Sequence, residues 1–292
     1  MDHGIVCYGE ILWDLLPSGP QPGGAPMNVA YQLHRLGKSP AMISRIGKDE
    51  RGDELMKVLQ SKGLNTKYIQ TDEAVPTGIV KATQHPNGDM SYDIVSPAAW
   101  DHIIADDTTE ALVKQAEYFV FGSLSARHAT SRNTLFRLLE LAHTKVLDIN
   151  LRTPHFSRPL IESLLQYADI LKLNIDELEL VTNWYGSYNN TADRVSLIRD
   201  KFGIRNMIVT MGANGAQLHL NGQSYTHPGY KVPVTDTVGS GDAFLAAIIS
   251  KTIDKAAPAA MLDFANRLAA TITTYKGAMP DYDIKEVDSI SH

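Results

Sequence analysis

The sequence predicts an α/β fold in which a mostly parallel sheet carries helices on its faces. From Tyr118 onward, short apolar runs alternate with stretches of helical period, the order expected when each strand returns to the sheet through a helix. Near the C-terminus, a strand-like run at Tyr230–Val234 precedes a glycine loop, after which Phe244 begins an apolar helical pattern. Both observations favour parallel strands joined by helices.

Composition is that of an ordinary globular protein. The chain has 292 residues, of which 43% are hydrophobic and 21% charged, so it can bury a sizeable core as one α/β domain with a small appendage or as two domains. A formal charge of −6 argues against a general surface for nucleic acid or anionic membranes. The one cysteine, Cys7, excludes an intramolecular disulfide and is expected to be a buried thiol. The sequence has no basic leader and no apolar stretch of ~20 residues, so we expect a cytoplasmic protein.

Strands and helices of the first hundred residues do not simply alternate. A helix begins near Pro26, and another is expected at 53–62 with Gly63 at its end. Asn87-Gly88 predicts a hairpin between two strands. The expected strands are Gly4–Tyr8, Ile11–Leu16, Ala41–Ile46, Thr77–Thr83 and Met90–Val95.

The rest of the chain supplies the alternating pattern. The expected strands are Tyr118–Gly122, Lys145–Ile149, Ile170–Leu173, Met207–Thr210 and Gln217–Leu220. The expected helices are Arg132–Ala142, Pro159–Tyr167, Asp176–Thr182, Thr191–Phe202 and Met261–Tyr275. Because ligands of α/β sheets bind at the carboxyl ends of the strands, we expect the polar residues after these strands to form a site.

The glycine loop contains Gly239-Ser240-Gly241-Asp242. Its glycines permit positive φ, and the following helix presents unpaired N–H groups, an arrangement suited to a phosphate. Asp242 would then take the proton of a hydroxyl as it attacks a phosphoryl group. Alternatively, Asp242 caps the helix and the glycines form a tight turn. Both interpretations remain open from this segment alone.

This segment resembles the second signature of the ribokinase-like sugar kinases, also called the PfkB family. The first signature is similar to Gly23-Gly24-Ala25-Pro26-Met27-Asn28-Val29-Ala30, followed by Leu36-Gly37, Ser44-Arg45-Ile46-Gly47-Lys48-Asp49 and Gly52. The resemblance implies a three-layer α/β/α fold over residues 1–292 as a single domain. It also implies a small β-sheet lid contributed by about 11–24 and 76–100.

The resemblance implies ATP-dependent phosphorylation of a sugar hydroxyl with Asp242 as base. The amides of Gly239, Ser240 and Gly241 would stabilise charge on the transferring group. Asp148-x-Asn150-x-Arg152 is similar to a motif of the fructokinase-like branch, in which Arg152 would clamp the phosphoryl group or the substrate. The alternative for Arg152 is a surface salt bridge.

The resemblance also implies which residues recognise the sugar. Asp14 would accept hydrogen bonds from sugar hydroxyls, although an ordinary turn or edge aspartate is the alternative. Gly24 brings the backbone close to the sugar, and Asn28 would offer its amide, although it could equally be a local cap. Asn150 is the fourth candidate.

Nucleotide and metal positions also come from the resemblance. Asn174 and Glu177 would lie around Mg²⁺ and the nucleotide phosphates, and they also form a capping-box pattern that explains them structurally. Lys172 could add charge near the phosphates or simply snorkel. Further ATP candidates are Thr210, Gly212, Gly215 and Asn266, where a plain turn predicts the same glycines. Asp236 and the Val238 carbonyl match a monovalent-cation position, which would suit K⁺.

The substrate expectation is D-fructose. Gly9–Asp14 together with the Asp148 motif look most like bacterial fructokinases, while ribose, 2-keto-3-deoxygluconate and nucleosides remain alternatives, as does a non-catalytic sugar-binding relative. A nicotinamide-binding Rossmann enzyme would need G-x-G-x-x-G after the first strand, and a P-loop enzyme would need G-x-x-x-x-G-K-[ST]; the sequence has neither. The resemblance is compatible with a homodimer formed through the exposed face of the lid, and no nucleic-acid or membrane partner is expected.

Overall fold

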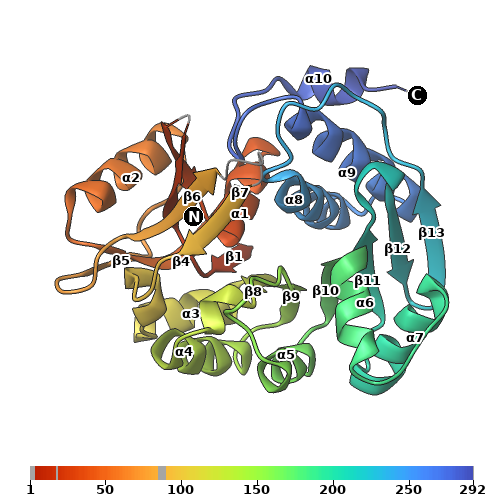
Figure 1. Ribbon diagram of the computed structural model, residues 1–292, viewed down its shortest axis with the longest axis horizontal. Helices are drawn as coiled ribbons and strands as arrows, with labels where there is room; N and C mark the ends of the chain where they lie inside the picture. Colours follow the sequence, from red (N-terminus) through yellow and green to blue (C-terminus); the bar gives the residue numbers. More distant parts are fainter. Residues whose placement is uncertain (1–3, 18, 85–89, 292) are drawn as a thin grey trace. The chain divides into compact units, whose positions relative to one another are not determined.

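The structure, a computed structural model, describes residues 4–17, 19–84 and 90–291. Its main sheet has nine strands in the order β13-β12-β11-β10-β9-β8-β1-β4-β5 (Figure 1). These strands are β1 (Ile5–Tyr8), β4 (Pro40–Gly47), β5 (Ile69–Asp72), β8 (Tyr118–Gly122), β9 (Thr144–Asp148), β10 (Ile170–Asn174), β11 (Asn206–Thr210), β12 (Ala216–Leu220) and β13 (Gln223–His227). Pairs β1/β4, β4/β5, β9/β10 and β10/β11 are parallel, and only the β11/β12 and β12/β13 pairs are antiparallel among those whose register is described. The predicted α/β class is confirmed.

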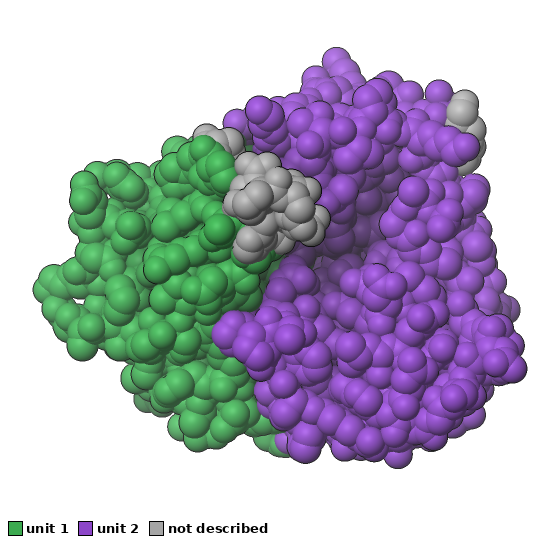
Figure 2. Space-filling view, viewed as in Figure 1, with its two compact units in different colours: residues 1–119, 125–143, 277–279 green, residues 120–124, 144–276, 280–292 purple. Residues whose placement is uncertain are grey.

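The chain forms two compact units, coloured separately in Figure 2. Unit 1 comprises residues 1–119, 125–143 and 277–279, and unit 2 comprises residues 120–124, 144–276 and 280–292. Each unit is assembled from separate stretches of chain, so no single linker divides them. The organisation of residues 1–292 as one domain stays a prediction.

Unit 1 is built around β1 and β4. Every residue of β1 is buried, as expected for a strand inside a parallel sheet, and Cys7 is the buried thiol that the sequence predicts. Tyr8, Tyr31 and Trp100 are among its largest fully buried side chains. The helices of this unit are α1 (Ala25–Arg35), α2 (Glu50–Ser61), α3 (Asp107–Gln115) and α4 (Ala129–Leu139).

A second, smaller sheet lies within unit 1. Its strand order is β3-β2-β6-β7, with β2/β6 parallel and the outer pairs antiparallel. The strands are β2 (Leu12–Leu16), β3 (Gly19–Gly23), β6 (Gly78–Gln84) and β7 (Met90–Ile94). All four fall inside the ranges expected for the lid, while the Asn87-Gly88 hairpin lies outside the described residues. Trp13 of β2 is buried, and its indole N–H donates to the Arg51 carbonyl of α2 at 2.9 Å.

Unit 2 places one apolar helix at its centre. Residues Ala243 to Ser250 of α8 are all buried, and a helix with no exposed face belongs to a protein interior. It packs against α9, which in turn contacts β12 and β13. The helices of this unit are α5 (Arg158–Leu165), α6 (Ile175–Asn183), α7 (Thr191–Phe202), α8 (Ser240–Ile253), α9 (Pro258–Thr273) and α10 (Ile284–Ser289). Within the described residues, no helix combines the length and the apolar character that crossing a membrane requires.

The predicted strand at Tyr230–Val234 is wrong. The last strand is β13, which pairs with β12 and completes that edge of the sheet, and residues 228–235 form no strand. Pro233 has no N–H to donate to a ladder, and Val234 is 62% exposed, so the alternating apolar pattern has no sheet to pack on. Instead, the backbone N–H groups of Thr235 and Asp236 donate to the Thr273 carbonyl at the end of α9.

Candidate active site

Three neighbouring strands of unit 2 end at the same edge of the sheet. In the parallel register, Asp148 of β9 lies opposite Lys172 of β10, and Asn174 of β10 lies opposite Thr210 of β11. Parallel strands bring their carboxyl ends to one edge, so polar residues far apart in sequence become neighbours there. The structure therefore brings together the Asp148, Asn174 and Thr210 positions, as the sequence predicts.

A buried ion pair lies at this edge. The Lys172 ammonium lies 2.9 and 2.7 Å from the two carboxylate oxygens of Asp148, and the two side chains are 8% and 5% exposed. Burial by itself would lower the pKa of Lys172, but the negative charges of Asp148, Glu177 and Asp242 raise it above its usual value. Lys172 is therefore a fixed buried cation rather than a snorkelling side chain.

Asn174 and Glu177 form the capping box that the sequence predicts at the start of α6. The Asn174 side chain accepts from the Glu177 N–H, and Glu177 accepts from the Asn174 N–H, both at 2.8 Å. The other oxygen of Glu177 accepts from the Leu151 N–H at 2.8 Å. Burial, together with repulsion by Asp148, raises the pKa of Glu177. Glu177 thus connects α6 to the loop after β9, a contact that spacing alone did not reveal.

The loop after β9 carries Asn150 and Arg152. Asn150 has φ of 38°, a conformation that Asn adopts more readily than most residues. The side chain of Arg152 is exposed, and its guanidinium makes only a long 3.5 Å contact to the Leu151 carbonyl. Of the described contacts, none is the surface salt bridge that was the alternative for Arg152.

The glycine loop leads directly into α8. Gly239, with φ of 78°, is the N-cap, and Ser240, Gly241 and Asp242 form the first turn of the helix. The Ser240 N–H donates to the Thr237 carbonyl at 3.3 Å, so this amide already has a partner in the turn before the helix. Asp242 is buried, so a carboxylate lies at the positive end of the helix dipole. The N–H of Val238 donates to the Asp236 carboxylate at 3.0 Å, which shapes the turn before the loop.

Two glycines follow β11, and the structure requires glycine at one of them for close packing and at the other for its backbone conformation. A Cβ atom on Gly215 would lie 2.0 Å from the His227 carbonyl oxygen, so close approach of the chain at β13 already requires glycine there. Gly212 has φ of 55° and open space around it. Asn266 of α9 is buried, and its amide donates to the Leu262 carbonyl of its own helix at 2.7 Å. The structure thus supplies local reasons for Gly215 and Asn266, and their ATP contacts stay predictions.

Three of the four candidates for sugar binding, Asp14, Gly24 and Asn28, belong to unit 1, and Asn150 belongs to unit 2. A Cβ atom on Gly23 would lie 2.2 Å from an Asp14 carboxylate oxygen, so Asp14 rests against the bare backbone of Gly23. Gly24 has φ of 121° and is the N-cap of α1, where a Cβ would lie 2.3 Å from the Glu10 carbonyl oxygen. Asn28, one turn into α1, is buried. The structure therefore gives Gly23 and Gly24 a packing requirement, while the roles of Asp14 and Asn28 stay predictions.

Glu10 is a buried carboxylate that the sequence interpretation left without a role. It follows β1, and one of its oxygens accepts from the Ala25 N–H at the start of α1 at 3.3 Å. This contact connects the end of β1 to the Gly23-Gly24 turn. Its place between Gly9 and the second strand was the available signal, but nothing in the sequence indicated its partner.

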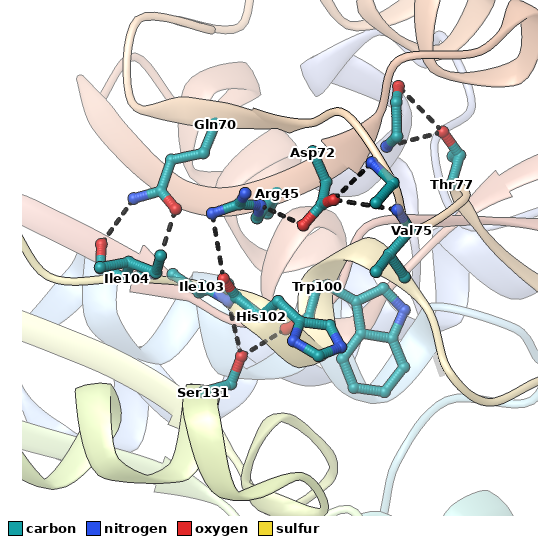
Figure 3. Close-up of polar contacts among 12 residues, drawn as sticks. Arg45, Gln70, Asp72, Val75, Thr77, Trp100, His102, Ile103, Ile104 and Ser131 are labelled. Atoms are coloured by element: carbon teal, nitrogen blue, oxygen red, sulfur yellow. Dashed lines mark hydrogen bonds and ion pairs between the residues drawn. The ribbon is translucent and has the colours of Figure 1, made fainter.

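The second half of the first signature, residues 44–52, makes structural contacts within unit 1. Arg45 lies 2.8 Å from Asp72 and donates to the His102 carbonyl, as Figure 3 shows. Asp49 caps α2 through the Gly52 N–H and accepts from both the N–H and the hydroxyl of Thr77. These contacts connect β4 and α2 to the end of β5 and to the segments that follow it. The structural contacts are enough to explain why Arg45 and Asp49 are needed, and no ligand has to be invoked.

The candidate carboxylate ligand for Mg²⁺ in unit 2 is that of Glu177. The described part of the chain holds no group of three or more His, Cys, Asp or Glu side chains placed to bind a metal ion. Glu177 uses each carboxylate oxygen for one backbone N–H, which leaves a further lone pair on each. That donor set fits Mg²⁺, which keeps several waters and binds proteins through one or two carboxylates plus substrate phosphates.

Comparison with known proteins gives a consistent family. The model of the pfkB family carbohydrate kinases matches residues 19–285. Fructokinase-1 of Zea mays is 29% identical, over 94% of this chain and 93% of its own length. The fructokinase of Escherichia coli is also 29% identical, over 96% of both chains. Among solved structures, an uncharacterized sugar kinase of Pyrococcus horikoshii in complex with ATP superposes with a TM-score of 0.83 at 27% identity, covering 97% of this chain and 99% of that one.

Proposed function

Because the chain belongs to the pfkB family of carbohydrate kinases, we propose that it transfers the γ-phosphate of ATP to a hydroxyl of a small sugar. D-fructose is the first candidate acceptor, since relatives from a plant and a bacterium that match nearly the whole chain are fructokinases. ATP as donor is supported by the ATP complex of the Pyrococcus horikoshii sugar kinase.

The observation that carries the proposal is the position of Asp242. It is a buried carboxylate in the first turn of α8, three residues after the left-handed Gly239, and a buried lysine of β10 contributes to the local charge. We assign to Asp242 the removal of the hydroxyl proton as that oxygen forms its bond to the γ-phosphorus and the bond to the ADP oxygen breaks. We assign to the backbone amides of Gly239, Ser240 and Gly241 the stabilisation of charge on the transferring group, for which the Ser240 N–H would exchange its Thr237 carbonyl partner for a phosphate oxygen.

The phosphate side of the proposal uses residues of unit 2. Arg152 is exposed and its planar guanidinium suits two phosphate oxygens at once. Asn174 and Glu177 would hold Mg²⁺ near the nucleotide phosphates, and the ion would neutralise charge on those phosphates when bound. Thr210, Gly212, Gly215 and Asn266 remain nucleotide candidates.

Acceptor and cation binding complete the proposal. Asp14, Gly24, Asn28 and Asn150 are proposed to recognise the sugar, because carboxylate and amide groups match neighbouring hydroxyls. Asp236 and the Val238 carbonyl are proposed to bind K⁺, which prefers oxygen ligands. We further propose a cytoplasmic location and a homodimer formed through the exposed face of the small sheet, both of which rest on the family alone.

The proposal is tested by ADP release from Mg·ATP with fructose, ribose, 2-keto-3-deoxygluconate, glucose and adenosine as acceptors. Fructose should give the highest kcat/KM. If another sugar is preferred, the kinase assignment stands and the acceptor assignment is wrong. If a sugar binds in calorimetry but none is phosphorylated, the chain is the non-catalytic sugar-binding relative instead.

Replacing the base provides the internal control. Asp242→Asn should lower kcat by on the order of 10²- to 10⁴-fold, because the hydroxyl loses its proton acceptor while the fold is retained. Circular dichroism and nucleotide binding by calorimetry check that the variant remains folded. Nearly full turnover in a folded Asp242→Asn protein would exclude this carboxylate as the base.

A further inference from the structure

Lys172 is a buried charged group to which the proposed reaction assigns no contact with the sugar or the nucleotide. It lies in β10, two residues before Asn174, and its ammonium is paired to both oxygens of Asp148. By contrast, the buried Arg127 of unit 1 is fully explained by local structure, because it pairs with Asp101 and donates to the carbonyls of Ile94 and Val95. Lys172 has no such set of carbonyl partners among its described contacts.

The same ammonium also lies against the glycine loop. A Cβ atom on Gly241 would lie 3.3 Å from the Lys172 nitrogen, so this lysine end packs directly against the first turn of α8. Its other contact, Asp148, begins the segment that leads to Asn150 and Arg152. One buried side chain therefore contacts both segments that carry proposed phosphate-binding groups.

The charges around Lys172 also favour a role in phosphoryl transfer. The carboxylates of Asp148, Glu177 and Asp242 all act electrostatically on this ammonium. A transferring phosphoryl group brings further negative charge, and a buried cation offsets part of the repulsion. Since replacing a buried ion pair by neutral groups often leaves stability unchanged, stability alone gives no need for a charge at this place.

We propose that Lys172 is a positioning residue for phosphoryl transfer, which holds Asp148 and the following loop against Gly241 and so fixes the first turn of α8 relative to Arg152. This inference rests on the proposed kinase function. It assigns to Lys172 no contact with the reacting atoms. Its effect is on the placement of groups that make such contacts, and misplacement by about 1 Å can cost on the order of 10²-fold in rate.

The test compares two variants with a matched control. Lys172→Met combined with Asp148→Asn removes both charges together, so no unpaired buried charge remains. Lys172→Arg keeps the charge but places a larger planar group beneath Gly241. The control is Lys145→Met with Asp169→Asn, because Lys145 at the start of β9 pairs with Asp169 at 3.7 Å before β10, at the opposite ends of the same two strands.

A positioning role predicts a specific split of the kinetic constants. Both Lys172 variants should lose kcat, the double variant by on the order of 10²-fold, while nucleotide Kd from calorimetry changes by less than about threefold. The control should keep kcat and Kd. A loss that follows only the folded fraction, or a kcat near that of the wild type in Lys172→Arg, would overturn the inference, and Lys172→Arg alone decides if the double variant does not fold. Absence of turnover in the wild-type protein would instead overturn the proposed function and this inference with it.

Discussion

Arg152 differs from the other charged residues of the candidate site because its side chain is exposed. Asp148, Lys172, Glu177 and Asp242 are all buried, and their positions are determined by packing. Among the described residues, Arg152 has one long backbone contact, so little in that part of the folded protein depends on it. The contribution of Arg152 to phosphoryl transfer therefore stays a proposal that can be tested separately from stability.

We expect Arg152→Ala to lower kcat by about 10²- to 10³-fold, the usual effect of removing one group that stabilises transition-state charge. The free energy of unfolding should change by less than about 0.5 kcal/mol, because the side chain is exposed. Steady-state kinetics and denaturant titration measure the two effects. Arg205→Ala, at an exposed arginine outside the candidate site, is the matched control and should alter neither. A variant at Arg152 with unchanged kcat would leave it as a plain surface residue.

For single residues, the sequence predicted local motifs better than contacts between residues that are distant in the chain. The capping box at Asn174 and Glu177 was predictable, since its spacing is local. The bond from the Leu151 N–H to Glu177, the pairing of Lys172 with Asp148 and the contact of Lys172 with Gly241 join residues of different strands and loops. Such contacts depend on strand register, which residue spacing does not determine.

Among the elements, α2 shows a signature residue with a structural task. Asp49 is the N-cap of this helix and also binds Thr77, which precedes β6. Burial opposes ionisation of Asp49, but hydrogen bonds from Thr77 and Gly52 lower its pKa below the usual value of 3.8. A lowered folded-state pKa means that the ionised carboxylate stabilises the fold above the usual pKa, and that this stabilisation is lost as the pH falls through the folded-state pKa.

Asp49→Ala should therefore cost about 0.5–2 kcal/mol at neutral pH, the range measured for N-cap removal. The difference in the free energy of unfolding between wild type and Asp49→Asn should shrink as the pH falls below 3.8, because protonation removes the same charge from the wild type. Denaturant titrations across this range measure it. Asp53→Asn removes an exposed carboxylate from the same helical turn and should show no such trend. An equal pH dependence in both variants would contradict the role assigned to Asp49.

Helices and strands were predicted correctly where the spacing of apolar residues and the capping residues indicated the same boundaries. Helix α7 begins and ends where the sequence predicts, and the predicted strands of the parallel sheet differ from the observed ones by one residue at their ends. Strands β3, β5 and β13 were missed because Gly-Pro-Gln-Pro-Gly, Ile-Gln-Thr-Asp and Gln-Ser-Tyr-Thr-His lack the apolar character of strands. All three lie at the edge of a sheet, where proline and polar residues are tolerated. The wrongly predicted strand at Tyr230–Val234 is the opposite case. Its apolar and polar residues alternate as in a strand, but no neighbouring strand is available for it to pair with.

At the scale of the whole molecule, the division into two units raises the question of whether they unfold separately. Neither unit is a continuous stretch of chain, and strand β8 contributes residues to both. Unfolding of one unit would therefore release strands and loops on which the other depends. We expect one cooperative transition, in which the calorimetric and van't Hoff enthalpies agree.

Ligand binding separates this expectation from independent unfolding. The proposed nucleotide residues all belong to unit 2, so a nucleotide that binds only there would stabilise that unit alone if the units unfolded independently. With cooperative unfolding, free nucleotide at 100 times its Kd should add about 2.7 kcal/mol to the stability of the entire chain and move the single transition as a whole. Calorimetric scans with and without Mg·ADP measure this, and the Asp53→Asn protein should shift by the same amount. Two transitions of which one moves would show that the units fold independently, and the nucleotide site would then belong to the unit whose transition moves.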